Sequence, residues 1–255
     1  MALVAALGRA ALALFREAGG ISLLGIYVAL CLLRGRIDWA ELRRNLYKMG
    51  VISVPIVVLT AFFTGGIMVI QSGIFVRRFG AYGLLGWGAG YAVFREVGPI
   101  LIGLMFSGRV GANNTAELGT MTVTEQIDGL RALAIDPLPY LIVPRVVAMM
   151  IAMFCLLIIG DAIAIGGGMI MSNLLLDVEF STFYVSFADN VKLWDLWVGL
   201  IKGVFFGLCI ALTSCHFGTS VRGGAAGVGR AVNDAVVAAA LLIMVSDNLL
   251  TMVLR

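Results

Sequence analysis

Residues 50–76 read GVISVPIVVLTAFFTGGIMVIQSGIFV and contain no charged side chain. A helix that crosses the hydrocarbon core of a bilayer needs about 20 apolar residues, so this run can cross it. The composition of the chain agrees: of its 255 residues, 61% are hydrophobic and 13% are charged. Soluble domains have roughly 45–50% apolar and about 25% charged residues. A water-soluble fold could not bury so much apolar surface, so the sequence predicts an all-α membrane protein.

Four further apolar stretches are long enough to cross the bilayer if a few ionisable residues are allowed within them. With residues 50–76 they predict about five transmembrane helices. Ionisable side chains at this depth usually face a cavity or a charged partner. The stretches and their charged residues are 79–108 with Arg95 and Glu96, 146–176 with Asp161, 193–221 with Asp195 and Lys202, and 235–254 with Asp247.

The N-terminal region has a different pattern. Its uncharged run, residues 18–33, is short for a crossing, and residues 34–48 combine many charges with Trp39, Leu42 and Leu46 at helical spacing. This pattern favours an amphipathic helix in the cytoplasmic interface over residues 1–48, followed by a transmembrane bundle over residues 50–254 in the same domain. A sixth span through residues 18–33 stays open as an alternative.

The basic residues predict the orientation, because cytoplasmic loops carry an excess of Lys and Arg. A cytoplasmic N-terminus and five spans put the C-terminus on the periplasmic side. The inner side then holds Arg9, Arg16, Arg34, Arg36, Arg43, Arg44, Lys48, Arg109, Arg131, Arg145, Arg222 and Arg230, and the outer side holds Arg77, Arg78, Lys192 and Arg255.

No pattern indicates a catalytic, metal or cofactor site. The four cysteines lie in apolar runs without CxxC spacing, and His216 is the single histidine. A phosphate-binding loop of the form GxxxxGK[ST] is absent from the sequence, so any ATP would be bound by a partner. We expect no nucleic-acid partner. The Gly86-x-x-x-Gly90 and Gly203-x-x-x-Gly207 spacings predict close helix contacts.

The segment between the second and third predicted spans is the longest cytoplasmic connection. Thr122 and Glu125 have capping-box spacing, which predicts a helix start near Thr122. Asp136-Pro137 ends that helix, because the residue before a proline disfavours helical geometry. A capped helix of mixed polarity over residues 122–135 suits docking of a soluble partner. A solvated connecting helix would give the same pattern.

Several short motifs in order resemble the MlaE/YrbE family of permeases. They include Arg95-Glu-Val-Gly-Pro99, Ser107-Gly-Arg-Val-Gly111 and Ala116-Glu-Leu-Gly-Thr-Met121. The likeness continues through Thr124-Glu-Gln-Ile-Asp128, Asp136-Pro137, Val143-Pro-Arg145 and residues 224–232. It ends with Asp247 and the Leu250-Thr251 pair, so that it covers most of the chain outside the N-terminal helix.

The resemblance implies a permease subunit in a bacterial inner membrane that moves phospholipid between inner and outer membranes. The implied partners are a second copy of the chain, a cytoplasmic ABC ATPase dimer, a periplasmic MCE-domain protein and a small cytoplasmic STAS-type accessory subunit. Implied ATPase-coupling residues are Glu117, Thr124, Glu125, Gln126, Asp128 and Arg131. Implied lipid-cavity residues are Met68, Gln71, Phe75, Phe79, Arg95 and Glu96.

Arg95 and Glu96 have two interpretations. Neighbouring residues on a helix point about 100° apart, so each should find its own partner. They could form a polar patch in the lipid cavity, or join a buried ion network with Asp161, Lys202 and Asp247. Both roles are compatible.

Other functions remain as alternatives. The cargo could be a sterol or another hydrophobic molecule. Ser107 and His216 could form the nucleophile and base of an intramembrane serine protease. A secondary transporter working alone would usually show internal repeats, which the sequence lacks.

Overall fold

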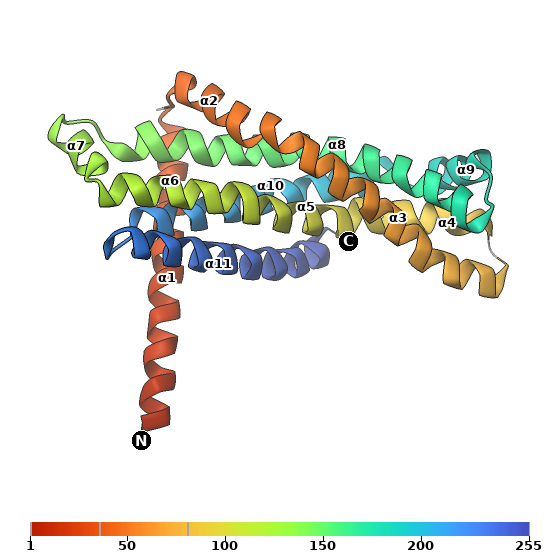
Figure 1. Cartoon of the computed structure of the whole chain (residues 1–255), viewed down its shortest axis with the longest axis horizontal. Coiled ribbons are helices and arrows are strands. Elements are labelled where there is room, and N and C mark those ends of the chain that lie inside the picture. Colours follow the sequence, from red (N-terminus) through yellow and green to blue (C-terminus); the bar gives the residue numbers. More distant parts are fainter. Residues whose placement is uncertain (1, 36, 81, 255) are drawn as a thin grey trace.

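A bundle of long helices dominates the structure (Figure 1). The computed structural model describes residues 2–35, 37–80 and 82–254, and this part of the chain is helical without strands. Six helical stretches are long and apolar enough to span a membrane, which agrees with the predicted all-α membrane protein. The two ends of the bundle are marked by the short helices α7 (Gln126–Ala132) and α9 (Phe180–Asn190) (Figure 1).

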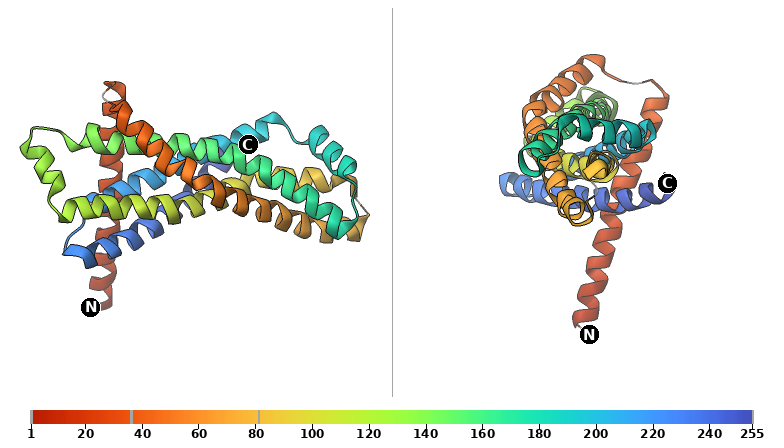
Figure 2. Two further views of the ribbon diagram at one scale, coloured as in Figure 1. Left: turned by 45° about the horizontal axis from the view of Figure 1, so that its top comes forward. Right: turned by 90° about the vertical axis from the view of Figure 1, so that its right-hand side faces the viewer.

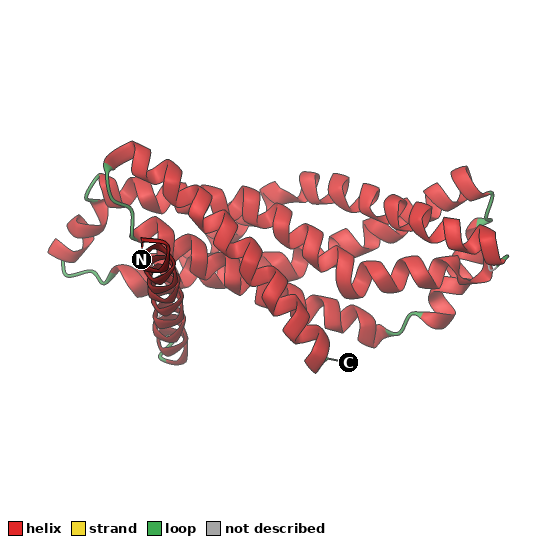
Figure 3. Cartoon of the chain, turned by 90° about the horizontal axis from the view of Figure 1, so that it is seen from below, coloured by secondary structure: helices red, strands yellow, loops and turns green. Residues whose placement is uncertain are grey.

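Helix α1 (Ala2–Leu33) runs crosswise to the other long helices in all the views (Figures 1, 2 and 3). The residues of its N-terminal half project away from the bundle, and its C-terminal half packs beside α10 (Leu193–Thr219). Its stretch Phe15–Leu33 is a candidate span by length and composition. Five candidate spans therefore follow the bundle, and the sixth crosses it.

The charged region after α1 forms α2 (Trp39–Met49). Asp38 caps its first turn by accepting hydrogen bonds from the backbone N–H groups of Ala40 (2.8 Å) and Glu41 (3.1 Å). One face of α2 is buried on α8 (Val143–Leu176), and the chain continues through a 3₁₀ turn (Val51–Ser53) into α3 (Val54–Phe79). The region predicted as one interfacial element is therefore two helices, of which α2 belongs to the bundle.

The second predicted span is longer than expected. A 3₁₀ turn (Tyr82–Leu84), α4 (Leu85–Ala92), α5 (Gly98–Phe106) and α6 (Ala112–Val123) form one helical path. Two π-helical segments, η3 (Val93–Val97) and η4 (Ser107–Gly111), join its parts. The span predicted to end at residue 108 thus continues to Val123, because η4 widens the helix without ending it.

Three long helices, α8, α10 and α11 (Gly224–Val253), complete the bundle. A third π-helical segment, η5 (Leu138–Ile142), leads into α8, and α9 and α10 are followed by α11. The core is largely built on α8, where Val146, Met149 and Leu157 are fully buried.

Both predicted glycine contacts are confirmed. A Cβ atom on Gly86 would overlap the carbonyl oxygen of Phe183 on α9, and one on Gly203 would overlap the Leu157 side chain on α8. Only a residue without a side chain allows the helices to approach so closely.

Candidate functional site

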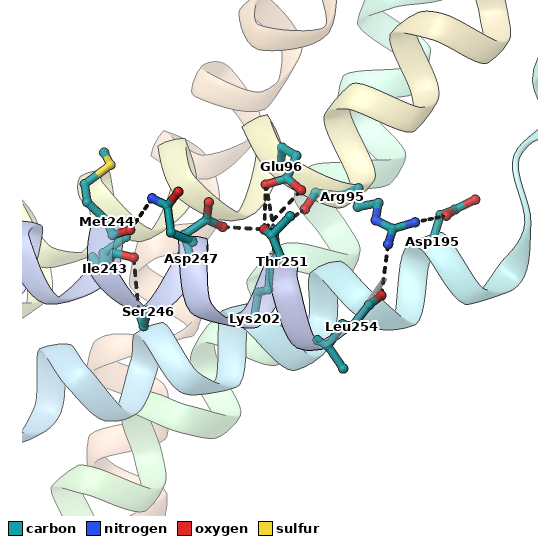
Figure 4. A network of polar contacts seen from close by, with 11 residues as sticks. Arg95, Glu96, Asp195, Lys202, Ile243, Met244, Ser246, Asp247, Thr251 and Leu254 are labelled. Carbon is teal, nitrogen blue, oxygen red and sulfur yellow. Dashed lines mark hydrogen bonds and ion pairs between the residues drawn. The ribbon is translucent and has the colours of Figure 1, made fainter.

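A buried lysine organises the charges inside the bundle (Figure 4). Lys202 on α10 has no exposed side-chain surface, and its Nζ donates hydrogen bonds to Glu96 Oε2 (2.6 Å) and Thr251 Oγ1 (2.8 Å). Nζ also lies 3.0 Å from Asp247 Oδ1, an ion-pair distance without hydrogen-bond geometry. A fully buried ammonium group is tolerated here because opposite charges and hydrogen-bond acceptors surround it. We call Glu96, Lys202, Asp247 and Thr251 the Lys202 cluster.

A proline prepares a further acceptor for this lysine. Pro99 has no N–H, so the carbonyl four residues earlier, that of Arg95, loses its usual helical partner. Lys202 Nζ donates to this carbonyl oxygen at 2.9 Å. The π-helical segment η3 lies at the same place, and Gly98 N–H bonds to Val93 O. Because of Pro99, the Arg95 carbonyl oxygen is therefore free to accept a hydrogen bond from the charged Lys202 side chain.

Arg95 points to different partners from those of its neighbour Glu96. Its Nη1 lies 3.2 Å from Asp195 Oδ1, its Nη2 donates to the Leu254 carbonyl at 2.9 Å, and its guanidinium is 5.5 Å from the centre of the Tyr91 ring. The contact with Leu254 ties the end of α11 to the second span. Arg95 and Glu96 thus hold the same two helices, α10 and α11, through separate contacts.

Asp161 does not join the Lys202 cluster. Its side chain is buried on α8, and neither carboxyl oxygen has a hydrogen-bond partner within the described residues. It faces the Gly98 backbone, where an added Cβ would come within 2.9 Å of Asp161 Oδ1. The structure therefore brings Lys202, Asp247 and Glu96 together and leaves Asp161 on its own.

The residues expected to line a lipid cavity lie on α3. Met68 is half-buried, whereas Gln71 and Phe79 are exposed on the surface of the single chain. The Phe75 side chain lies outside the described part of the structure. A small groove of about 190 Å³ between α3 and α8 is lined by Ile70, Gly73, Ile74, Leu175 and Leu176, none of which was expected there.

Toward the α7 end of the bundle, a second set of charges ties four helices together. Glu117 on α6 forms ion pairs with Lys48 on α2 and with Arg145 on α8, the latter at 3.1 Å. Arg145 is buried and donates a second hydrogen bond to Asn114 Oδ1 (2.7 Å), and Asn114 Nδ2 donates to Ser214 Oγ on α10 (2.9 Å). We call these five residues the Arg145 network. It fixes the base from which α7 projects.

The helix predicted over residues 122–135 differs from the helices that the structure has there. Thr122 lies near the end of α6, not at a helix start, and its Oγ1 donates to the carbonyls of Leu118 (2.8 Å) and Gly218 (3.1 Å). Glu125 has a left-handed backbone (φ 59°), which turns the chain into α7. Helix α7 ends at Ala132, and Ala134 is again left-handed (φ 58°). The prediction of a single helix over residues 122–135 was wrong, because the residues with capping-box spacing lie at the turn between α6 and α7.

The other expected coupling residues are displayed on the surface around α7. Thr124, Glu125, Gln126, Asp128 and Arg131 are exposed. Asp128 and Arg131 form an ion pair of 2.8 Å with both side chains about two-thirds exposed. Exposed pairs of this kind contribute roughly 0–1 kcal/mol, so these charges remain available to a partner.

The geometry disfavours a serine protease. Ser107 Oγ is buried and has no hydrogen-bond partner among the described residues. His216 Nε2 lies 2.7 Å from Glu17 Oε2 on α1. The histidine thus connects two helices, and it does not contact the serine hydroxyl that it would need to activate.

Sequence reasoning missed several residues that build these two sites. Asn114, Asp195 and the Leu254 carbonyl were not predicted as site residues. Thr251 was noted only as part of a motif, and Arg145 only as part of a motif and as a basic residue of the inner side. A charged side chain within an apolar stretch was the available signal for Asp195, whereas Asn114 lies in a polar stretch that gave none. The Leu254 carbonyl gives no sequence signal at all.

The long apolar helices define a multi-pass helical membrane protein. The family model described as Permease MlaE matches residues 42–253. The chain belongs to this family of permeases.

Similar proteins come from several organisms. A probable ABC transporter permease protein of Rickettsia bellii is 37% identical over 96% of this chain and 95% of its own length. The intermembrane phospholipid transport system permease protein MlaE of Haemophilus influenzae is 31% identical over 98% of this chain and 97% of its own. The chloroplastic protein TRIGALACTOSYLDIACYLGLYCEROL 1 of Arabidopsis thaliana is 34% identical over 88% of this chain and 64% of its own.

Proposed function

We propose that the chain is the permease subunit of an ABC transporter that moves phospholipid between two membranes, energised by a separate ATPase. The observation that carries this proposal is the likeness, over nearly the whole of both chains, to the Haemophilus influenzae permease, whose name specifies intermembrane phospholipid transport. The Rickettsia bellii relative is named as an ABC transporter permease, which fits a subunit that depends on an ATPase partner.

Helix α7 is the proposed contact for the ATPase. It is short, its charged side chains are exposed, and it projects from the end of the bundle (Figure 1). The Arg145 network joins the base of α7 to α2, α8 and α10, so a push on α7 would be transmitted to several spanning helices. Rigid packed helices transmit such displacements, because close-packed interiors compress little.

Two copies of the chain would enclose the lipid path. The α3 surface exposes an apolar stripe at helical spacing, made of Leu59, Phe63, Ile67, Ile70 and Ile74. A second copy facing this stripe would enclose Gln71 and Phe79 in a cavity suited to acyl chains. About a third (34%) of the Glu96 side chain is exposed, so the Lys202 cluster can hold the helices together and still meet a headgroup.

The remaining partners and the location follow from the same proposal. The permease pair would lie in a bacterial inner membrane, with α7 and the N-terminus on the cytoplasmic side. A periplasmic MCE-domain protein would receive or deliver lipid at the α9 end, and a STAS-type subunit would attach on the ATPase side.

ATP-dependent lipid transfer tests this function. The chain, co-purified with its ATPase and MCE-domain partner, is reconstituted into vesicles that carry a fluorescent phospholipid. Acceptor vesicles report the transfer. We expect transfer that requires ATP hydrolysis. Equal transfer with and without ATP would contradict an ABC mechanism, and ATP-dependent transfer of a sterol without phospholipid would contradict the cargo.

A further inference from the structure

A groove of about 560 Å³ lies between the crosswise helix α1 and α11. Helix α1 crosses the bundle in its part nearer α7 (Figure 1). Apolar side chains dominate its walls: Ile21 comes from α1, and Val237 and Leu241 come from α11. The remaining lining residues are Glu17, Ala18, Ser22, Phe217, Asn233, Asp234, Ala238 and Leu242.

A second hollow of about 260 Å³ adjoins this groove, since Glu17, Phe217 and Asp234 line both. It adds two cations, Arg222 and Arg230, near the start of α11. We call the two hollows together the α1–α11 groove. Its α11 wall extends from Gly227 to Leu242, which at 1.5 Å per residue is roughly 22 Å. One leaflet of a bilayer with its headgroups has about this thickness.

A contact between His216 and Glu17 fixes α1 and thereby shapes the groove. His216 Nε2 lies 2.7 Å from Glu17 Oε2, and Gly20 lets the histidine ring lie directly against the α1 backbone, where a Cβ would overlap it. Helix α1 is thereby held on α10, and the space between it and α11 stays open.

The charges of the groove are balanced and gathered at one end. Arg222 and Arg230 face the same hollow as Glu17 and Asp234, whereas the lining from Val237 to Leu242 holds no ionisable residue. Arg230 and Asp234 are one turn apart, ~6 Å along the helix, a separation that a two-carbon ethanolamine arm can bridge. A ligand with one anionic and one cationic group would satisfy both signs. The phosphate of a purely anionic headgroup could also contact the arginines, but Asp234 and Glu17 would then have no cationic group of the ligand to pair with.

We infer that the α1–α11 groove binds a phospholipid with a zwitterionic, amine-bearing headgroup. The phosphate contacts Arg222 and Arg230, and the ammonium contacts Asp234 and Glu17. One acyl chain lies along Ile21, Val237 and Leu241. The site is separate from the Lys202 cluster, which lies further along α11, and it requires neither an ATPase nor ATP.

Photo-crosslinking of the full-length chain in nanodiscs tests this inference. The nanodiscs contain phosphatidylcholine and phosphatidylglycerol. The probe is a phosphatidylethanolamine with a diazirine in one acyl chain, compared with a phosphatidylglycerol that carries the same chain. Peptide mass spectrometry locates the adducts. We expect the ethanolamine probe to label residues 17–22 and 233–242 roughly tenfold more than the glycerol probe, because charged hydrogen bonds to the headgroup are lost with glycerol.

Two variants separate the headgroup from the acyl chain. Ala238→Trp fills the groove and should abolish labelling, while Val245→Trp, on an exposed apolar part of α11 outside the groove, should leave it unchanged. Asp234→Asn keeps the shape of an exposed side chain and should remove the preference for ethanolamine. Equal labelling by both probes in the wild-type chain would overturn the inference. So would undiminished labelling of Ala238→Trp, or a groove found crosslinked to a second copy of the chain.

Discussion

At the scale of single residues, the cost of burying a charge explains the arrangement around Lys202. Its ammonium has three protons, and the structure supplies the Glu96 carboxylate, the Thr251 hydroxyl and the Arg95 carbonyl as acceptors. Asp247 adds a nearby negative charge. Removal of the lysine would leave two carboxylates facing each other in an apolar region, which is costly unless one takes up a proton.

We therefore predict that Lys202→Met strongly destabilises the protein. Breaking a buried ion pair by removing one partner costs roughly 3–5 kcal/mol, so the midpoint of thermal unfolding in detergent should fall markedly. Arg78→Met removes one exposed positive charge and serves as the control. The double variant Lys202→Met/Glu96→Gln should be less destabilised than the sum of its single changes, because the two residues interact directly. An unfolding midpoint equal to that of Arg78→Met would contradict the importance of the cluster.

At the scale of helices, close contacts through glycine hold the bundle together. Two adjacent glycines of α8 provide a matched comparison. A Cβ on Gly167 would lie 2.5 Å from the Phe62 carbonyl oxygen of α3, whereas a Cβ on Gly166 would meet no atom within 4 Å. The same substitution at neighbouring positions should therefore have opposite effects.

Gly167→Ala should lower stability by roughly 1–3 kcal/mol, because the added methyl group forces α3 and α8 apart. Gly166→Ala should raise stability by about 0.5–1 kcal/mol, since alanine favours the helix and no neighbour opposes it. Thermal or denaturant unfolding of the two purified variants measures both effects. If both changes had the same sign, the contact between α3 and α8 would not be as close as the structure indicates.

Helix α7 is a second element with a specific prediction. Asp128→Arg places a positive charge beside Arg131 on its exposed surface and should weaken capture of the ATPase at least tenfold, since like charges at an interface cost several kcal/mol. Asp189→Arg on α9, at the other end of the bundle, is the matched control. Co-purification with the tagged ATPase measures the effect. Equal yields of folded permease from both variants establish that the fold is intact. Capture of the ATPase by the Asp128→Arg variant at the wild-type level would show that α7 is not part of the interface.

At the scale of the whole molecule, the direction of α1 decides the topology. Six stretches qualify as spans by length and composition, but α1 runs crosswise to the other five (Figures 1 and 3). If the bundle axis follows the membrane normal, α1 lies in the plane of the bilayer and does not cross it. The chain then crosses five times, and its ends face opposite sides.

Reporter fusions test this topology. A C-terminal alkaline phosphatase should be active, and the same enzyme fused at the N-terminus should be inactive, because it folds only outside the cytoplasm. Fluorescent protein fusions should give the reverse result. Two ends on the same side would show that α1 crosses the membrane.

Much of the fold followed from the sequence, because hydrophobicity along the chain is a local property. The uncharged run of residues 50–76 marked a spanning helix without any knowledge of its neighbours. The separate partners of Arg95 and Glu96 were also predictable, since the helix turns about 100° per residue. Helix boundaries were less predictable: the spacing of Thr122 and Glu125 suits a capping box, but the left-handed backbone of Glu125 depends on how α6 and α7 meet.

The sequence alone thus determined that this chain is a membrane protein, how many helices follow the bundle, and that Arg95, Glu96, Asp161, Lys202 and Asp247 lie within it. Only the tertiary structure decided which charges meet. Lys202 and Glu96 are 106 positions apart, and Arg95 and Leu254 are 159 apart. Such contacts depend on how the helices pack, whereas the tendency to enter a membrane depends only on each segment. The direction of α1 was likewise decided by packing, because the same apolar helix can cross a bilayer or lie in its surface.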